Sequence, residues 1–359
     1  MFSQADRLQI QQKGITVDIV NQQIDFFKKG IPFLRIVRPA ILGDGILMLT
    51  EADCKKFISI YDTEKPGLKI MKFTPASGAA TRMFKALYEY VSKPSSAIIA
   101  DDVAQVINKI QSFAFYNDLV KVIAKNKQDL DVLLKTSSYQ EVIDYILSEK
   151  GLNYGNLPKG LLKFHTHSYE GRTPLEEHLV EGALYAQNSD KSVILHFTVS
   201  PEHLQAFSTL AENVKTKYEK AFEVAFAISF SVQKSSTDTI AVDGRNNPFR
   251  NADGSLIFRP GGHGALLDNL NDLDGDIIFL KNIDNVAPDR LKESTVLYKK
   301  VLAGLLLDIQ KSVFEYLKKL ERTDLSEEFY GEVSSFAKTH LGFQFSPAFS
   351  STRRVPIWK

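Results

Sequence analysis

The chain has 359 residues, a length that suits one large domain or about two ordinary ones. Its 44 Lys and Arg residues nearly balance its 43 Asp and Glu residues, so the basic excess typical of nucleic-acid binders is missing. Hydrophobic residues make up 44% and charged residues 24%, a mixture that excludes a wholly disordered chain. The single cysteine, Cys54, cannot form an internal disulfide.

Neither a secretion signal nor a membrane span is expected. Residues 1–10 are polar and lack the apolar core of a signal peptide. The longest apolar run, residues 301–307, is far too short to cross a bilayer. The sequence therefore predicts a cytoplasmic protein that binds neither nucleic acid nor a membrane.

The first periodic segment is helical. Val20, Ile24 and Phe27 recur at helical spacing, and a glycine, Gly30, follows where a helix would end. Four later runs have the apolar, β-branched or aromatic composition of buried strands: residues 68–74, 193–199, 224–232 and 276–280. Because helical patterns separate these runs, they predict an α/β fold with a Rossmann-like, mostly parallel sheet and helices on both faces.

The segment between the first two strands has helical periodicity. Its first apolar residues follow the spacing of an amphipathic helix: Val103, Val106, Ile107, Ile110 and Phe113. Asn117 begins another such pattern. Ser138 and Glu141 have the spacing of a capping box, and Gly151 is placed to end the helix that follows. We therefore predict a helical insertion over residues 91–151.

The region after the fourth strand begins with another helix. Asp289 is placed to cap it, and its apolar side chains share one face: Tyr298, Leu302, Leu305, Ile309, Tyr316 and Leu320. Residues 339–359 show no clear period. The predicted organisation is a helical N-terminal region, an α/β core in two pieces, the insertion, and a C-terminal helix with a tail: 1–67, 68–90 with 152–288, 91–151, and 289–359.

A strand, a turn of small residues and the start of a helix follow one another over residues 68–85. The turn contains Ala76, Ser77, Gly78, Ala79 and Ala80. Backbone N–H groups in such a turn can approach a ligand closely, and the following helix directs its positive end toward it. Arg82 can bind phosphate oxygens through two N–H groups. Taken alone, the segment suits a nucleotide-phosphate site and a tight turn with a surface arginine about equally.

Polar residues follow the strand at 276–280. Ligands of open α/β sheets bind at the carboxyl ends of the strands, so Asp284 is placed to hold Mg²⁺. The plainer interpretation is that Asp284 and Asn285 cap a turn.

A glycine-rich loop and a glutamine offer a base-binding surface. Gly261, Gly262 and Gly264 allow a backbone to lie flat against a planar ligand. Gln233, at the end of the strand at 224–232, can offer its amide to a base edge. Singly, the loop is equally compatible with a flexible turn and the glutamine with a polar strand end.

Two histidines alternate along a short extended segment. His165 and His167 would lie on one face of a strand, with Glu176, Glu177 and His178 close behind in sequence. A metal site is one interpretation of this group. The others, which the sequence favours, are a position near a phosphate site and a polar turn.

In chain order these segments resemble the UDP-sugar pyrophosphorylase superfamily, the UTP–sugar-1-phosphate uridylyltransferases, as a divergent member of bacterial type. The first family motif, Leu-x-Gly-Gly-x-Gly-Thr-Arg-Leu, is similar to residues 75–83, where Ser77 and Ala80 replace two glycines. The Pro-Lys element is similar to Pro158 and Lys159. The later elements are similar to four segments: a strand ending in Thr-Val-Ser at 198–200, a strand ending in Gln233, Pro-Gly-Gly-His-Gly at 260–264 and Asn-Ile-Asp-Asn at 282–285.

The resemblance implies a nucleotide-diphospho-sugar transferase fold. It also implies transfer of UMP from UTP, or transfer from another NTP, to a sugar 1-phosphate, with release of pyrophosphate and dependence on Mg²⁺. Arg82 and Lys159 would be catalytic and hold the phosphates, and Asp284 would hold the metal ion. Uracil would contact Gln233 and Gly262. The nucleotide-binding residues implied are Ala76, Ser77, Gly78, Ala79, Gln233, Gly262, His263 and Asn285.

Acceptor-side elements of that family are not recognisable between Val286 and Lys359. Either this is a truncated form, or the acceptor side is built differently. The alternative function is a catalytically inactive nucleotide- or sugar-nucleotide-binding protein of the same fold, which the residues at Ser77 and Ala80 favour.

Overall fold

The computed structural model describes residues 2–78, 80–92, 100–168, 170–322 and 324–343. The chain divides into two compact units. The first contains Met1–Gly45 and Leu68–Val296, and the second contains Ile46–Gly67 and Leu297–Lys359. This division differs from the predicted one at residues 1–67, because the two parts of that region belong to different units.

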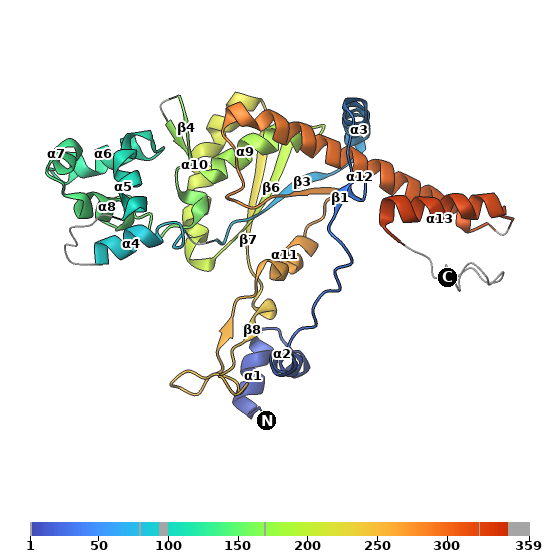
Figure 1. The fold of residues 1–359 in the computed structure, drawn as a ribbon, viewed down its shortest axis with the longest axis horizontal. Coiled ribbons are helices and arrows are strands. Elements are labelled where there is room, and N and C mark those ends of the chain that lie inside the picture. Colours follow the sequence, from blue (N-terminus) through green and yellow to red (C-terminus); the bar gives the residue numbers. More distant parts are fainter. Residues whose placement is uncertain (1, 79, 93–99, 169, 323, 344–359) are drawn as a thin grey trace. The chain divides into compact units, whose positions relative to one another are not determined.

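A four-stranded parallel sheet forms the centre of the first unit (Figure 1). Its strands are β3 (Ile70–Pro75), β6 (Ser192–Val199), β7 (Ala225–Val232) and β10 (Ile277–Leu280). They lie in the order β10-β3-β6-β7, and every neighbouring pair is parallel. The fold is thus mixed α/β and compatible with a Rossmann-like arrangement, in which the strand order reverses beside the first strand.

The four predicted strands are confirmed, and their ends differ from the prediction by no more than two residues. Every residue of β3 is buried, as expected for a central parallel strand with cover on both faces. This buried strand nevertheless contains a charged residue, Lys72, whose side chain is fully buried.

Helices pack against this sheet. α9 (Pro174–Tyr185) and α10 (Leu204–Phe222) share an apolar core with one face of β6. The short helix α11 (Leu267–Asn271) contacts the other face at the carboxyl edge. There Asn269 donates hydrogen bonds to Ser231 Oγ and to the carbonyl oxygen of Val232.

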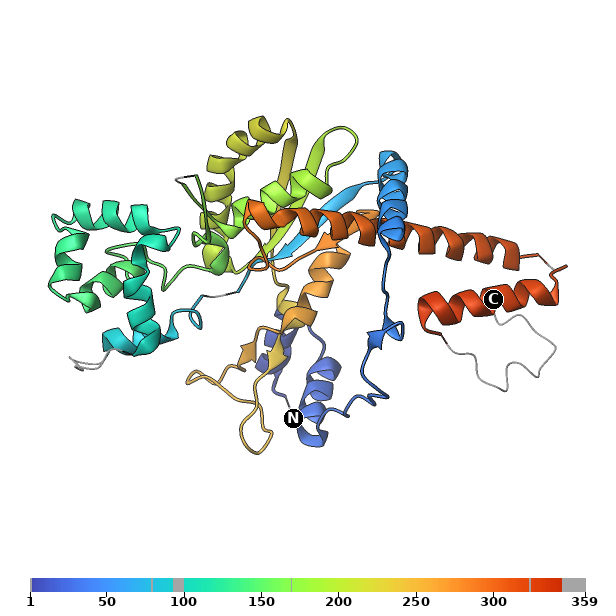
Figure 2. The ribbon, with the colours of Figure 1, turned by 45° about the horizontal axis from the view of Figure 1, so that its top comes forward.

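Between β3 and β4 (His165–His167), the described residues form five α-helices that gather into one group (Figures 1 and 2). They are α4 (Lys85–Ser92), α5 (Asp101–Asn108), α6 (Tyr116–Lys125), α7 (Leu130–Lys135) and α8 (Tyr139–Leu147). Val103, Ile107 and Ile110 are buried in a core that belongs to this segment, as their periodicity predicts. The helices therefore hold together by burying one another's apolar faces.

The capping box predicted at Ser138 and Glu141 is not formed. Ser138 is the N-cap residue of α8 but makes no side-chain cap hydrogen bond. Glu141 instead accepts a hydrogen bond of 2.7 Å from Gln128 Nε2, so its carboxylate is drawn away from the helix end. The same helix ends before Gly151. Gly151 instead allows the backbone to pass close to Tyr145, because a Cβ at this position would lie 1.8 Å from the Tyr145 carbonyl oxygen.

The N-terminal helices α1 (Gln4–Gln12) and α2 (Val17–Lys29) share an apolar cluster with the antiparallel pair β8 (Thr239–Ile240) and β9 (Phe258–Arg259). The predicted end of α2 is confirmed, since Gly30 follows it with a φ of 75°. Two other short hairpins are β1–β2 and β4–β5, with strands Ile41–Leu42, Gly45–Ile46, His165–His167 and Glu170–Arg172.

The second unit is helical. It contains α3 (Glu51–Glu64), most of α12 (Lys292–Leu320) and α13 (Glu327–Leu341). A Cβ at Gly304 of α12 would lie 1.8 Å from the Phe57 carbonyl oxygen, so these two helices approach closely there. Residues 344–359 of the predicted tail lie outside the described residues. Among the described helices, none is both long and apolar enough to cross a membrane.

Candidate functional site

The carboxyl ends of β3 and β10 meet beside the point where the strand order reverses, which is where open α/β sheets bind ligands. A cavity of about 610 Å³ lies at this edge. Its walls come from five separate stretches of the first unit, and seven of the predicted site residues line it: Ser77, Gly78, Arg82, Lys159, Gln233, Gly262 and Asp284.

The other predicted residues are placed differently. Ala76 is fully buried, and its N–H donates a 2.7 Å hydrogen bond to the Thr198 carbonyl oxygen, so that N–H cannot serve a phosphate. Asn285 is exposed and does not line the cavity. Ala79 and the side chain of His263 lie outside the described residues.

The connection after β3 is longer than predicted. Helix α4 begins at Lys85, so Arg82 lies in a turn that precedes the helix. Lys85 is exposed and pairs with Glu89 along that helix, at 3.8 Å. The cavity is therefore lined by Arg82 and by the turn at Ser77 and Gly78, whereas the first residue of α4 does not line it.

Lys159 joins the two ends of the helical insertion at the cavity. Its backbone N–H donates a 3.2 Å hydrogen bond to the Gly78 carbonyl oxygen. Its Nζ lies 2.6 Å from Asp284 Oδ2, and both side chains are about one-third exposed, at 28% and 37%. A cation and a carboxylate from segments 125 positions apart thus face the same open space.

The glycines differ in the room around them. A Cβ at Gly78 or Gly262 would meet nothing within 4 Å, so the backbone at both positions borders open space. At Gly261, a Cβ would lie 2.8 Å from the Thr237 carbonyl oxygen. Gln233 Nε2 lies 3.3 Å from the Gly261 carbonyl oxygen, so this amide also holds the glycine loop in place.

His178 positions the segment that carries Asp284, a role that no local pattern in the sequence predicts. It is fully buried in α9, and its Nε2 lies 3.2 Å from the carbonyl oxygens of Asn282 and Ile283. Burial and the nearby charge of Lys72 hold the pKa of His178 well below its usual value. A neutral ring with its hydrogen on Nε2 can therefore donate to this backbone.

A buried ion network lies beside it. Glu181 Oε2 is 2.8 Å from Lys72 Nζ, and Glu181 Oε1 is 2.6 Å from Lys281 Nζ. Burial acts to raise the pKa of Glu181, but the two lysines outweigh it and lower the pKa to about 2. The network joins β3, α9 and the residue that follows β10.

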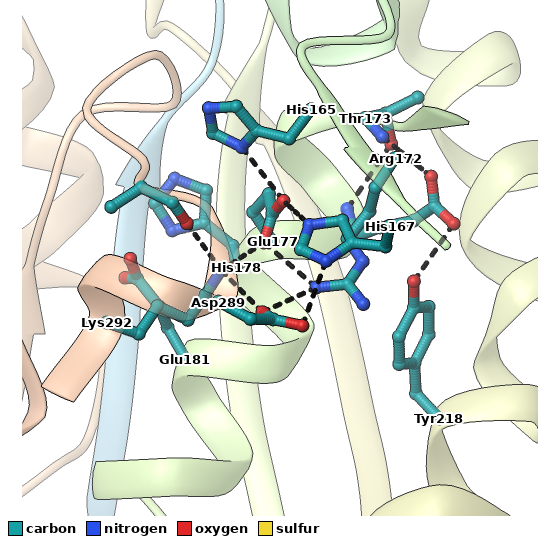
Figure 3. A network of polar contacts seen from close by, with 12 residues as sticks. His165, His167, Arg172, Thr173, Glu177, His178, Glu181, Tyr218, Asp289 and Lys292 are labelled. Atoms are coloured by element: carbon teal, nitrogen blue, oxygen red, sulfur yellow. Dashed lines mark hydrogen bonds and ion pairs between the residues drawn. The ribbon is translucent and has the colours of Figure 1, made fainter. Parts of the chain in front are cut away.

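A second polar cluster, the histidine cluster, consists of His165, His167, Arg172, Glu177, Asp289 and Lys292 (Figure 3). The two histidines share one face of β4, as predicted. His165 Nδ1 and His167 Nε2 each lie 2.9 Å from Glu177 Oε1. Arg172 and Lys292 donate to Glu177 Oε2. Burial acts to raise the pKa of Glu177, but hydrogen bonds from Lys292 and His165 lower it overall.

The prediction that Asp289 caps the long C-terminal helix is wrong. Its carboxylate lies 2.9 Å from Arg172 Nη1, 3.0 Å from His167 Nδ1 and 3.0 Å from Lys292 Nζ. The N-cap residue of the 3₁₀ turn that starts this region is Pro288 instead. The Asp289 carboxylate therefore binds the side chains of Arg172, His167 and Lys292 rather than backbone N–H groups at the start of the helix.

The fold is that of an α/β protein with a cavity at the strand-order reversal of a parallel sheet. The chain belongs to the family described as "Domain of unknown function (DUF4301)", which it matches over residues 3–356. No curated protein and no solved structure matches it significantly.

Proposed function

We propose that this protein is a nucleotidyltransferase that transfers UMP from UTP to a sugar 1-phosphate and releases pyrophosphate in a Mg²⁺-dependent reaction. The observation that carries the proposal is the cavity at the β3–β10 edge. It collects two cationic side chains, one carboxylate, one amide and open glycine backbone from segments that resemble the motifs of UDP-sugar pyrophosphorylases. A reaction between two anions needs cationic groups that neutralise charge and polar groups that align the reactants.

In the proposed reaction, a phosphate oxygen of the sugar 1-phosphate attacks the α-phosphorus of UTP. An O–P bond forms, the bond from the α-phosphorus to the bridging oxygen breaks, and pyrophosphate leaves with the electron pair. The nucleophile is already an anion at neutral pH, so a general base is not needed. Arg82 and Lys159 would neutralise phosphate charge, and Gln233 would contact the uracil edge.

The carboxylate of Asp284 suits a magnesium ion. Mg²⁺ commonly takes one or two carboxylates and completes its shell with water and substrate phosphates, and this carboxylate borders an open cavity. When bound, the ion would neutralise phosphate charge. Lys159 pairs with Asp284, and we expect its ammonium group to contact the substrate phosphates when they bind.

The proposal is tested by pyrophosphate release from UTP with a panel of sugar 1-phosphates. We expect release that requires both Mg²⁺ and one sugar 1-phosphate. Gly262→Ala should fold normally but weaken UTP binding, because its methyl group would project into the space beside the cavity. Gly264→Ala is the matched control, since a Cβ there also meets open space but Gly264 does not line the cavity.

Two observations favour a second function, a nucleotide-binding protein without turnover. The 2.6 Å pair between Lys159 and Asp284 neutralises the carboxylate, and Ala80, in place of a family glycine, is buried. Such a protein would gain thermal stability from UTP yet release no pyrophosphate with any acceptor.

A further inference from the structure

We propose that His165, His167 and Glu177 form a binding site for a divalent transition-metal ion, with Zn²⁺ as the best match. The ligand atoms would be His165 Nδ1, His167 Nε2 and Glu177 Oε1. All three lie within 4.8 Å of one another. Two histidines and one carboxylate are a common set of three protein ligands for zinc sites that keep a fourth position for water.

His167 contacts a carboxylate through each of its ring nitrogens. Its Nδ1 lies 3.0 Å from Asp289 Oδ2, and its Nε2 lies 2.9 Å from Glu177 Oε1. In the tautomer that carries its hydrogen on Nδ1, the ring donates to Asp289, and the Nε2 lone pair is available to a metal ion that Glu177 also binds.

The surroundings have the features of an outer ligand shell. Asp289 orients His167 from the far side of the ring, the arrangement that fixes metal-binding histidines in proteins. Arg172 and Lys292 hold Glu177 through Oε2 and leave Oε1 to the histidines. The two cations balance the carboxylates of Glu177 and Asp289, so the ion enters a cluster in which these four charges cancel.

Regular structure positions all three ligands. His165 pairs with Arg172 across the β4–β5 hairpin, and the two histidines project to the same side. Glu177 lies in the first turn of α9, whose start is fixed by a capping box of Thr173 and Glu176. A second cavity of about 450 Å³ is lined by His167 and Arg172 and offers a path for the ion.

This site does not depend on the proposed transferase function. None of its three ligands lines the cavity at the β3–β10 edge. Nitrogen ligands favour zinc and related ions, whereas Mg²⁺ prefers oxygen ligands alone. Millimolar Mg²⁺ should therefore leave Zn²⁺ binding here unchanged.

The test is calorimetric titration of the full-length, chelator-treated protein with Zn²⁺ alone. We expect one tight site in the wild type, and a loss of affinity of at least about 100-fold in His165→Ala. His165 is the variant of choice because neutralising Glu177 would remove one of the two carboxylates that pair with the buried Lys292. His340→Ala, which removes an exposed histidine on α13, is the control and should bind as tightly as the wild type.

Two further measurements keep the outcome decisive. Asp289→Asn should weaken Zn²⁺ binding by about 10- to 100-fold, the usual effect of losing a partner of a metal-bound histidine. Co²⁺ in place of Zn²⁺ should give the strong visible absorption of a four-coordinate site, and His165→Gln should lose it while keeping a polar group near Glu177. Unchanged Zn²⁺ affinity in His165→Ala and His165→Gln, or no stoichiometric binding in the wild type, would overturn the proposal.

Discussion

The cavity at the β3–β10 edge and the histidine cluster use similar side chains in opposite ways. In the cavity, Lys159 and Asp284 are about one-third exposed. Lys159 begins a 3₁₀ turn that follows the helical insertion, and Asp284 lies in the loop that follows β10. In the cluster, Glu177 and Lys292 are buried, and each is held by several partners. Exposed groups at a sheet edge can exchange partners with a substrate, whereas buried, mutually paired groups form a fixed frame.

The difference predicts that changes in the cavity reduce activity, whereas changes in buried ion networks reduce stability. Asp284→Asn should remove Mg²⁺-dependent turnover almost completely and leave the fold intact, because it removes a partly exposed charge with little change in size. Pyrophosphate release and thermal unfolding measure the two effects. Asp272→Asn, at an exposed aspartate that pairs with Lys234, is the control. Full activity in Asp284→Asn would exclude the metal-binding role.

Glu181→Gln should lower the free energy of unfolding by about 3–5 kcal/mol, because Lys72 and Lys281 would stay buried without a counter-charge. Chemical denaturation measures this. Glu89→Gln removes an exposed partner of Lys85 and should change stability by less than about 1 kcal/mol. Equal effects of the two substitutions would mean that the buried network does not stabilise the fold.

The same carboxylate gives a pH dependence. The pKa of Glu181 is lowered from 4.5 to about 2 in the folded chain. The ionised carboxylate therefore contributes fully to the free energy of unfolding above the pKa of the unfolded chain, and this contribution is lost as the pH falls toward 2. The loss is on the order of 3 kcal/mol. Urea unfolding at pH 6 and pH 3 should show a smaller decrease in Glu181→Gln than in the wild type. An identical decrease in both proteins would assign the acid sensitivity to other groups.

Gln233→Ala should reduce the preference for UTP over other nucleotides by about 1–3 kcal/mol, the cost of leaving a polar partner unpaired. Because this amide also contacts the Gly261 carbonyl oxygen, some loss of overall affinity should accompany it. The ratio of kcat/KM values for UTP and the other nucleotides measures selectivity. A ratio equal to that of the wild type would place the uracil contact elsewhere.

Much of the sheet and the cavity lining follows from local sequence. The strands are apolar because they are buried, and the turn of small residues that follows β3 lines the cavity. The prediction for Asp289 fails because its side chain pairs with residues that only the tertiary structure brings near it. Asp289 is drawn to Arg172 and His167, far from it in sequence, rather than to the helix that it precedes. The partnership of Lys72 with Glu181 spans 109 positions, which no local pattern reveals.

Residues 46–67 belong to the second unit with the C-terminal helices, although they follow the N-terminal helices in sequence. The close approach of Gly304 to Phe57 in that unit is a tertiary contact that periodicity does not encode.

The most direct test of the central claim compares two lysines near the turn after β3. Lys159 contacts both Gly78 and Asp284, whereas Lys85 is exposed and pairs with Glu89. We predict that Lys159→Ala lowers kcat/KM for UTP by about 10²- to 10³-fold, as expected when a charge-stabilising donor is lost. Lys85→Ala should stay within about twofold of the wild type, since it removes one exposed ion pair. Equal losses in the two variants, or a larger loss in Lys85→Ala, would contradict the assignment of this cavity as the nucleotide site.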